Sequence, residues 1–278
     1  MENEKWKTGL NIELDFLRSL KTLVSTFTQI AQETNGDINE YKQRMQALQN
    51  STEYANYIDN SVRRMVTPLA VQNMATWRKA AKKASKNPLF YFMLMRELND
   101  GLKLDIESQV KENAELIKTL PIDTANKVVF DIEKYTFEGI RAEEIANKIT
   151  KYTDKHARAS ARLIARTEVS KTTTALTRAR SENLGLNWYI WRTALDGDRV
   201  RKSHRNMEGV LVNWSEPPSP EKLVGEKDVG NYHAGNIWNC RCYPEPIVDE
   251  DDIPQNPKVY TQGKIERMSK TKFIKEFM

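Results

Sequence analysis

The residue types best suited to chemistry in this chain of 278 residues gather toward its C-terminal end. The segment Tyr232–Pro246 holds the only two cysteines, Cys240 and Cys242, and one of the three histidines, His233. Together with His204, these residues offer two sulfur and two nitrogen atoms, a ligand set that zinc uses in tetrahedral sites. A small, loop-rich β region that buries little apolar surface would gain stability from such a metal. The sequence therefore suggests a zinc site made of His204, His233, Cys240 and Cys242.

Other interpretations of the same residues stay open. Only one residue separates the cysteines, whereas paired zinc-binding cysteines usually have two residues between them, so both can instead be small buried side chains without metal. The two histidines could serve as acid and base in a metal-independent nuclease, with Arg201, Lys202 or Arg205 binding a phosphate. A disulfide between Cys240 and Cys242 is disfavoured, because residues two apart in a strand are poorly placed for the bridge geometry.

A basic segment precedes this region. Between Lys151 and Arg205 the sequence has thirteen basic and five acidic residues, although the net charge of the whole chain is only +5. Such a segment could contact the phosphates of DNA or an acidic protein surface, and it could equally be the solvated face of a helix. The candidates for contact with DNA or a partner protein are Arg158, Arg162, Arg166, Arg199, Arg201 and Lys202.

The elements that must position these residues differ between the two halves of the chain. Apolar residues recur at steps of three and four through the first two thirds, the spacing of amphipathic helices. The helices predicted from this spacing cover 10–33, 38–62, a segment from Pro68 to the basic tract 78–86, 89–119, 124–139, 141–151 and 154–184.

After Gly185 the sequence becomes typical of strands. Aromatic and β-branched residues predict strands at 188–193 and 209–214, a third short strand is expected at 237–243, and 215–231 is expected to be an irregular loop.

The predicted fold class is α+β. A mostly helical N-terminal region (1–120) leads to a region (121–248) in which helices precede a small antiparallel β module, and a C-terminal tail follows (249–278).

Composition narrows the class of protein. Charged residues make up 29% of the chain and hydrophobic ones 39%, which indicates much solvated helix surface. The sequence has no run of about 18 apolar residues and no secretory signal at Met1–Leu10. We therefore expect no membrane association, folding in the cytoplasm and two reduced cysteines.

An ordered set of motifs runs through the second half of the chain. It comprises Ile164–Glu168 (IARTE), Trp191–Asp196 (WRTALD), Asp198–Arg201 (DRVR), Ser203–His204, Gly209 and Asn239–Cys242 (NCRC) with Pro244. In this order the motifs resemble the phage minor head protein family, the domain typified by the phage Mu F protein, over about residues 120–248. Many relatives carry Cys-x-x-Cys where this chain has Arg201–His204, so the resemblance implies a four-ligand metal set only if His204 substitutes for a cysteine.

The resemblance implies a non-enzymatic minor head protein of a tailed phage, made in the host cytoplasm and present in few copies in the virion. Such a protein associates with the portal inside the head and acts in head assembly and genome packaging or delivery. The implied partners are the portal protein, packaged DNA, other head proteins and further copies of the chain. The alternative is a nuclease or zinc-dependent effector acting on nucleic acid, but only about thirty residues follow Pro246, too few for an added enzyme domain.

Overall fold

The structure is a computed structural model that describes residues 6–7, 9–83, 91–93, 96, 102–136, 142–194 and 200–278. Contacts divide the chain into two units. We call Leu10–Thr67 with Glu107–Glu168 the helical unit, and Met1–Gly9, Pro68–Ile106 and Val169–Met278 the sheet unit. The predicted helix 89–119 falls largely outside the described residues before Leu102.

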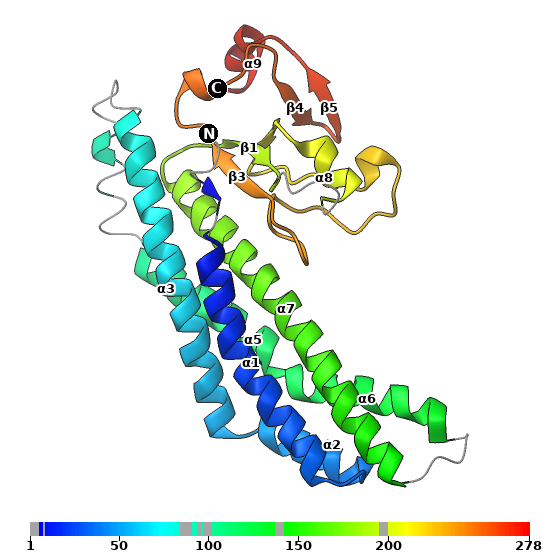
Figure 1. The fold of residues 1–278 in the computed structure, drawn as a ribbon. Coiled ribbons are helices and arrows are strands. Elements are labelled where there is room, and N and C mark those ends of the chain that lie inside the picture. The colour runs from blue at the N-terminus through cyan, green and yellow to red at the C-terminus, as the bar shows by residue number, and fades with distance from the viewer. Residues whose placement is uncertain are drawn as a thin grey trace. The chain divides into compact units, whose positions relative to one another are not determined.

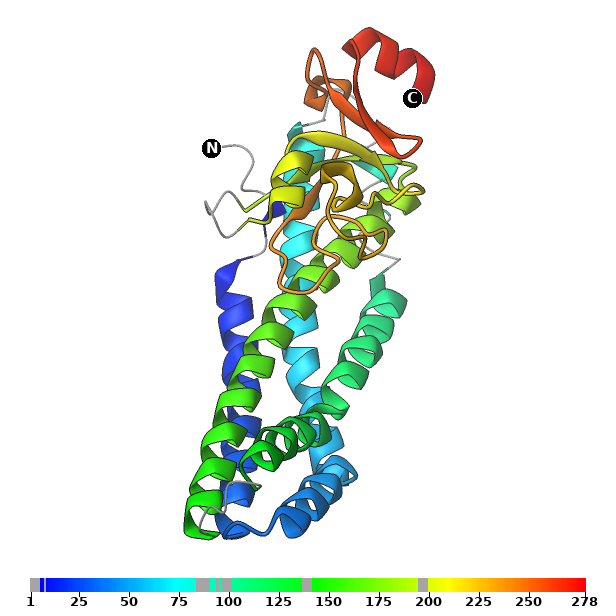
Figure 2. The ribbon, with the colours of Figure 1, turned by 90° about the vertical axis from the view of Figure 1, so that its right-hand side faces the viewer.

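The helical unit is built from α1 (Leu10–Glu33), α2 (Ile38–Gln49), α6 (Leu120–Thr136), most of α5 (Leu102–Lys118) and the first parts of α3 (Thr52–Lys83) and α7 (Ala142–Asn183). Figures 1 and 2 show α1 lying along the first part of α3, where the Tyr57 hydroxyl donates to the Ser19 carbonyl at 2.9 Å. Apolar side chains spaced three and four apart, among them Phe16, Leu20 and Phe27, are buried in this bundle.

Local capping explains where the second predicted helix divides. The segment 38–62 was predicted as one helix, but the structure ends α2 at Gln49 and starts α3 at Thr52. The Ser51 hydroxyl accepts the Tyr54 amide at 3.1 Å, which satisfies a free N–H at the start of α3. A Ser at this position therefore begins a new helix within an unbroken apolar pattern.

Three other helix boundaries are corrected by the structure. Pro68 lies inside α3 rather than at its start. The burial of Val66 and Leu69 therefore offsets the free energy lost with the backbone hydrogen bond that proline cannot donate. α6 begins at Leu120 rather than Thr124, because Pro121 fits the first helical turn. The segments 141–151 and 154–184 form one helix, α7, through Thr153, whose hydroxyl lies 2.8 Å from that of Tyr41.

The sheet unit contains a five-stranded sheet in the order β3-β1-β2-β4-β5. Its strands are β1 (Trp188–Arg192), β2 (Val210–Asn213), β3 (Tyr243–Pro246), β4 (Lys258–Thr261) and β5 (Lys264–Arg267). The α+β class is confirmed, but the sheet is mixed rather than antiparallel throughout, because β4 pairs in parallel with β2. The third strand was predicted six residues too early: Ile237–Cys242 turns, with Asn239 at a positive φ of 58°, and β3 begins at Tyr243.

The strands β1, β2 and β4 bury alternate residues on the two faces of the sheet. On one face, Trp188, Ile190 and Leu211 pack with Val259 and with Phe273 of α9 (Lys270–Phe277), the helix at the C-terminal end in Figure 1. The segment 249–278, expected to be a tail, thus supplies two strands, the 3-10 turn η4 (Glu250–Asp252) and a helix. Its apolar residues are few, so their spacing alone did not predict their burial.

The other face of the sheet carries the candidate site. On this face, the strands direct five side chains into a core that also contains both cysteines and Met207 of the short helix α8 (Lys202–Met207). These side chains are Tyr189, Trp191, Val210, Val212 and Tyr260. In the described part of the chain, no helix combines the length and the apolar composition needed to cross a membrane.

Candidate metal centre

The structure brings His204, Cys240 and Cys242 together under the sheet. The Nδ1 atom of His204 lies 3.5 Å from Sγ of Cys240 and 3.4 Å from Sγ of Cys242, and all three ligand atoms lie within 4.8 Å of one another. The side chains are only 3%, 3% and 4% exposed, respectively. Among the residues that the structure describes, this is the one cluster of three or more His, Cys, Asp or Glu side chains with such spacing.

These distances fit a tetrahedral zinc ion. With Zn–S near 2.3 Å and Zn–N near 2.0–2.1 Å, a tetrahedral angle separates sulfur from nitrogen by about 3.5 Å. The two observed sulfur–nitrogen distances match that value. The donor set of two thiols and one imidazole is also one that zinc accepts, so the residues present fit the metal and leave one coordination position to another ligand.

A hydrogen-bonded chain on the far side of the imidazole orients His204. Its Nε2 lies 3.0 Å from the hydroxyl of Tyr232, which donates to both carboxylate oxygens of Glu221 at 2.7 Å. The hydroxyl of Ser203 donates to the same carboxylate at 3.2 Å. In the tautomer in which Nε2 of His204 donates to the Tyr232 hydroxyl, the Nδ1 lone pair faces the sulfurs and is available to a metal.

The two thiols are not equivalent. The pKa of Cys240 is lowered well below its ordinary value, first by a hydrogen bond from Cys242 and also by His204. The backbone amide of Cys242 donates to the same sulfur at 3.3 Å. The pKa of Cys242 is raised, because it donates to Cys240 and is buried. The pair therefore loses one proton readily, and a bound cation would favour loss of the second.

The fourth predicted ligand, His233, does not join this cluster. Its Nδ1 lies 3.1 Å from the hydroxyl of Tyr189, and its ring packs against Trp214 with centroids 5.1 Å apart. Burial, followed by the charge of Arg178, lowers the pKa of His233 to about 4. His233 is thus a neutral core residue beside the metal centre.

Two residues of the site were missed by sequence reasoning. Glu221 comes from the segment expected to be an irregular loop, just before the 3-10 turn η3 (Lys222–Val224), and Tyr232 precedes the predicted ligand His233. Glu221 is 6% exposed, a burial that its hydroxyl partners make possible. No spacing in the sequence pairs Glu221 with Tyr232, and the folding of the loop alone brings them together.

The predicted basic contacts are divided between the units. In the helical unit, Arg158 pairs with Asp154 at 2.7 Å, Arg166 lies 3.5 Å from Glu13, and Arg162 is exposed. A nearby carboxylate offsets part of the charge that Arg158 and Arg166 present.

In the sheet unit, Lys202 is exposed on α8 and Arg201 precedes that helix. Arg199 lies outside the described residues.

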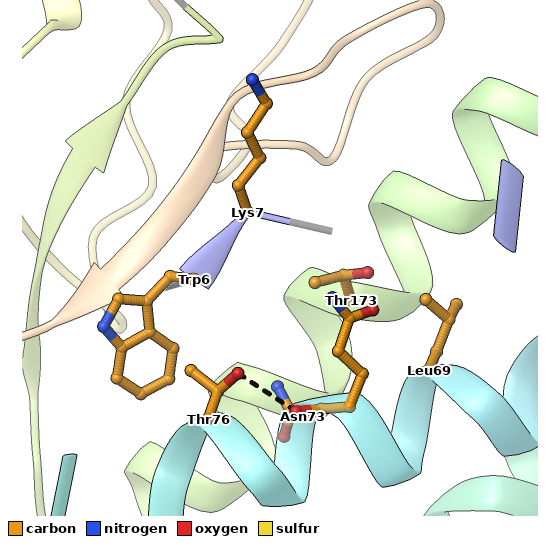
Figure 3. Close-up of a pocket in the computed structure, with 7 residues that line it drawn as sticks. Trp6, Lys7, Leu69, Asn73, Thr76 and Thr173 are labelled. Atoms are coloured by element: carbon orange, nitrogen blue, oxygen red, sulfur yellow. Dashed lines mark hydrogen bonds between the residues drawn. The ribbon is translucent and has the colours of Figure 1, made fainter. Parts of the chain in front are cut away.

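A small pocket lies elsewhere in the sheet unit (Figure 3). Trp6, at its edge, packs edge-on against Trp77 with ring centroids 5.0 Å apart. The pocket is lined by Trp6, Lys7, Leu69, Gln72, Asn73, Thr76 and Thr173. These residues include no thiol, imidazole or carboxylate, the side chains that most often bind metal ions.

Part of the chain is similar in sequence to known proteins. The model of the family described as "Phage Mu protein F like protein" matches residues 126–244, from within α6 to the second residue of β3. An uncharacterized protein of Haemophilus influenzae (strain ATCC 51907 / DSM 11121 / KW20 / Rd) is 31% identical over 157 residues, which are 56% of this chain and 32% of the relative. This chain therefore matches about a third of that relative's length.

No solved structure matches the chain significantly. The family match covers the ordered motifs at 164–168, 191–204 and 239–244 and all three residues of the metal cluster. It ends before β4, β5 and α9, which complete the sheet. Residues 126–244 are thus the part of the chain that is similar to the Phage Mu protein F-like family.

Proposed function

We propose that this chain is a minor head protein of a tailed phage, which acts at the portal vertex in head assembly and in packaging or delivery of the genome. The observation that carries the proposal is the family match over 126–244. The matched segment includes the second part of α7, β1, β2, α8 and both cysteines, and therefore most of the core of the sheet unit. The portal protein, other head proteins and further copies of the chain are the proposed protein partners.

The role we propose for the metal centre is structural. His204, Cys240 and Cys242 would hold a zinc ion, with Tyr232 and Glu221 orienting the imidazole. Bound zinc supplies fixed bonds that close the loop 232–242 onto α8, in a region with few aliphatic side chains. The three ligands are almost fully buried, as expected for a site that holds a fold together rather than one that receives substrate.

We further propose that the protein is not an enzyme. A nuclease using His204 and His233 would need both imidazoles accessible to a phosphodiester. Each histidine is 3% exposed, and the two contact different tyrosines, Tyr232 and Tyr189. This arrangement favours the structural proposal over the nuclease or effector alternative.

The test is the location of the protein during phage assembly. An affinity-tagged portal protein is recovered from procapsids and from mature virions, and this chain is quantified in both fractions. We expect it to copurify with the portal, and we expect a phage lacking it to give few infectious particles despite normal synthesis of capsid protein. Absence of the chain from procapsids and virions would contradict the proposal, whereas cleavage of DNA or RNA by the pure protein would favour the alternative.

A further inference from the structure

One tryptophan is held at the surface beside the metal centre. Trp238 is 51% exposed, although its neighbours Ile237 and Cys240 are buried. The guanidinium of Arg201 lies over the indole, 5.6 Å from the ring centroid, and Nη2 of Arg201 donates to the Trp238 carbonyl at 2.9 Å. Arg201 therefore fixes the loop and the ring together and leaves part of the aromatic surface open to solvent.

Two further cationic side chains lie on the short helix that follows Arg201. α8 directs Ser203, His204 and Met207 into the core, so that Lys202 and Arg205 are exposed on its outer side. Sγ of Cys240 lies 3.5 Å from Nδ1 of His204, so the loop that carries Trp238 contacts the same short helix.

A nearby carboxylate already has hydrogen-bond and ion-pair partners. Glu208, just after α8, accepts from the Thr193 amide and hydroxyl at 2.6 and 2.7 Å and pairs with Arg192. The outer side of α8 therefore exposes Lys202 and Arg205, directly after the residue that contacts the Trp238 ring.

We propose that Trp238, Arg201, Lys202 and Arg205 form a nucleic-acid contact that stacks an accessible base on the indole and binds the adjoining phosphates. Aromatic side chains within a cationic surface bind unpaired strands in this way, because every base presents a flat face and every nucleotide a phosphate. A protein partner fits the lysine less well, since the cores of protein interfaces are depleted in lysine. The inference rests on the proposed function in that it names the phage genome as the ligand of this surface.

The proposed contact also restricts the form of nucleic acid that can bind. Stacking on Trp238 requires a base that is not already stacked on both faces, as in a single strand or at the end of a duplex. The interior of an intact duplex would reach only the cations and would bind through phosphates alone.

The test is binding of the full-length protein to a fluorescein-labelled oligothymidylate of about 15 nucleotides, within the range of known single-strand sites. Trp238→Ala should weaken binding about 5- to 150-fold, which corresponds to the contribution of about 1–3 kcal/mol that stacking makes per base, and Trp238→Phe should retain most of the affinity. The double variant Lys202→Ala/Arg205→Ala should reduce the slope of log affinity against log salt by about 1.4, at about 0.7 per phosphate contact. A blunt duplex of the same length, with fewer accessible bases per molecule, should respond less to Trp238→Ala.

Two variants serve as matched controls. Phe92→Ala removes another exposed aromatic ring and Lys227→Ala another exposed cation, and both should bind as the wild type does. Circular dichroism confirms folding of each variant.

Two results would overturn the inference. One is wild-type protein that does not bind the oligonucleotide at about 50 mM salt, where phosphate contacts are strong. The other is Trp238→Ala protein that binds it with unchanged affinity. If either result occurs while the chain still copurifies with the portal, the proposed function stands and only the nucleic-acid contact fails. Loss of portal association by Trp238→Ala, without oligonucleotide binding by the wild type, would assign the surface to a protein.

Discussion

The hydroxyl of Thr174 donates a 2.7 Å hydrogen bond to the carbonyl of Ala234, and this bond joins α7 to the loop that leads to both cysteines. Thr174 is 2% exposed and Ala234 is fully buried. In Figure 2 this loop runs along the second part of α7 within the sheet unit. The loop that carries both cysteines is therefore held by two elements, by α7 through Thr174 and by α8 through His204.

Gly235 permits this close approach, and its replacement by alanine should be strongly destabilising. A Cβ atom there would lie 2.5 Å from Oγ1 of Thr174 and 2.8 Å from the Cys242 carbonyl oxygen, and the backbone has a φ of +85°. A positive φ costs about 1–2 kcal/mol for a side-chain residue, and overpacking adds about 1–3 kcal/mol. Gly225→Ala, at φ +73° with open space around it, should show only the cost of the positive φ. Urea denaturation of both variants tests the difference, and equal losses would show that the loop does not press on α7.

Zinc content should follow the three-residue cluster rather than the four residues suggested by the sequence. Protein purified without added metal should contain about one zinc per chain, and His204→Ala, Cys240→Ser and Cys242→Ser should each lose most of it. His233→Gln should retain zinc, because its Nδ1 contacts Tyr189 and not the cluster. Elemental analysis measures the zinc content of each protein, and circular dichroism checks that each protein is folded.

Removal of zinc should also lower stability. A chelator should reduce the thermal midpoint of the wild type but not of Cys240→Ser, because only the former has metal to lose. Substoichiometric zinc in the wild type, or an equal chelator effect on both proteins, would contradict a metal-bound centre.

Buried His233 should make stability fall in mild acid. Its pKa is lowered to about 4 in the folded state, against about 6.5 when exposed, so the unfolded chain binds more protons between these values. The stabilising contribution is complete above about pH 6.5 and is lost as the pH falls toward 4, a total of about 3 kcal/mol. Free energies of unfolding at pH 7 and pH 4.5 should differ less in His233→Gln than in the wild type. An identical pH dependence in both would show that His233 is solvated.

The predictable parts of this structure were those with regular spacing or rare residue types. The periods of three and four residues located α1, and runs rich in aromatic and β-branched residues located β1 and β2. All three residues of the metal cluster were among the four suggested by the sequence, because the chain has only two cysteines and three histidines. The sequence therefore predicted the elements whose conformation is set by residues close to one another in the chain.

The remaining features depend on contacts between residues far apart in the chain. His233 has the chemistry of a ligand, but the loop turns it toward Tyr189 instead, and no pattern in the sequence encodes that direction. Glu221 and Tyr232 meet only after the loop has folded. The β2–β4 pairing likewise needs the chain to cross the sheet after β3, which apolar spacing does not record.

Phe273 should be essential to the sheet unit, although it lies in the segment that the sequence suggested is a tail. The ring is fully buried and meets Trp188 edge-on, with centroids 5.0 Å apart, on the face of the sheet opposite the metal centre. Phe273→Ala should cost about 3–5 kcal/mol, because a large aromatic ring leaves a cavity between α9 and β1. Lys275→Ala, on the exposed side of the same helix, should change stability by less than about 0.5 kcal/mol. Denaturant titration followed by tryptophan fluorescence measures both, and a Phe273→Ala protein as stable as the control would mean that α9 does not cover the sheet in solution.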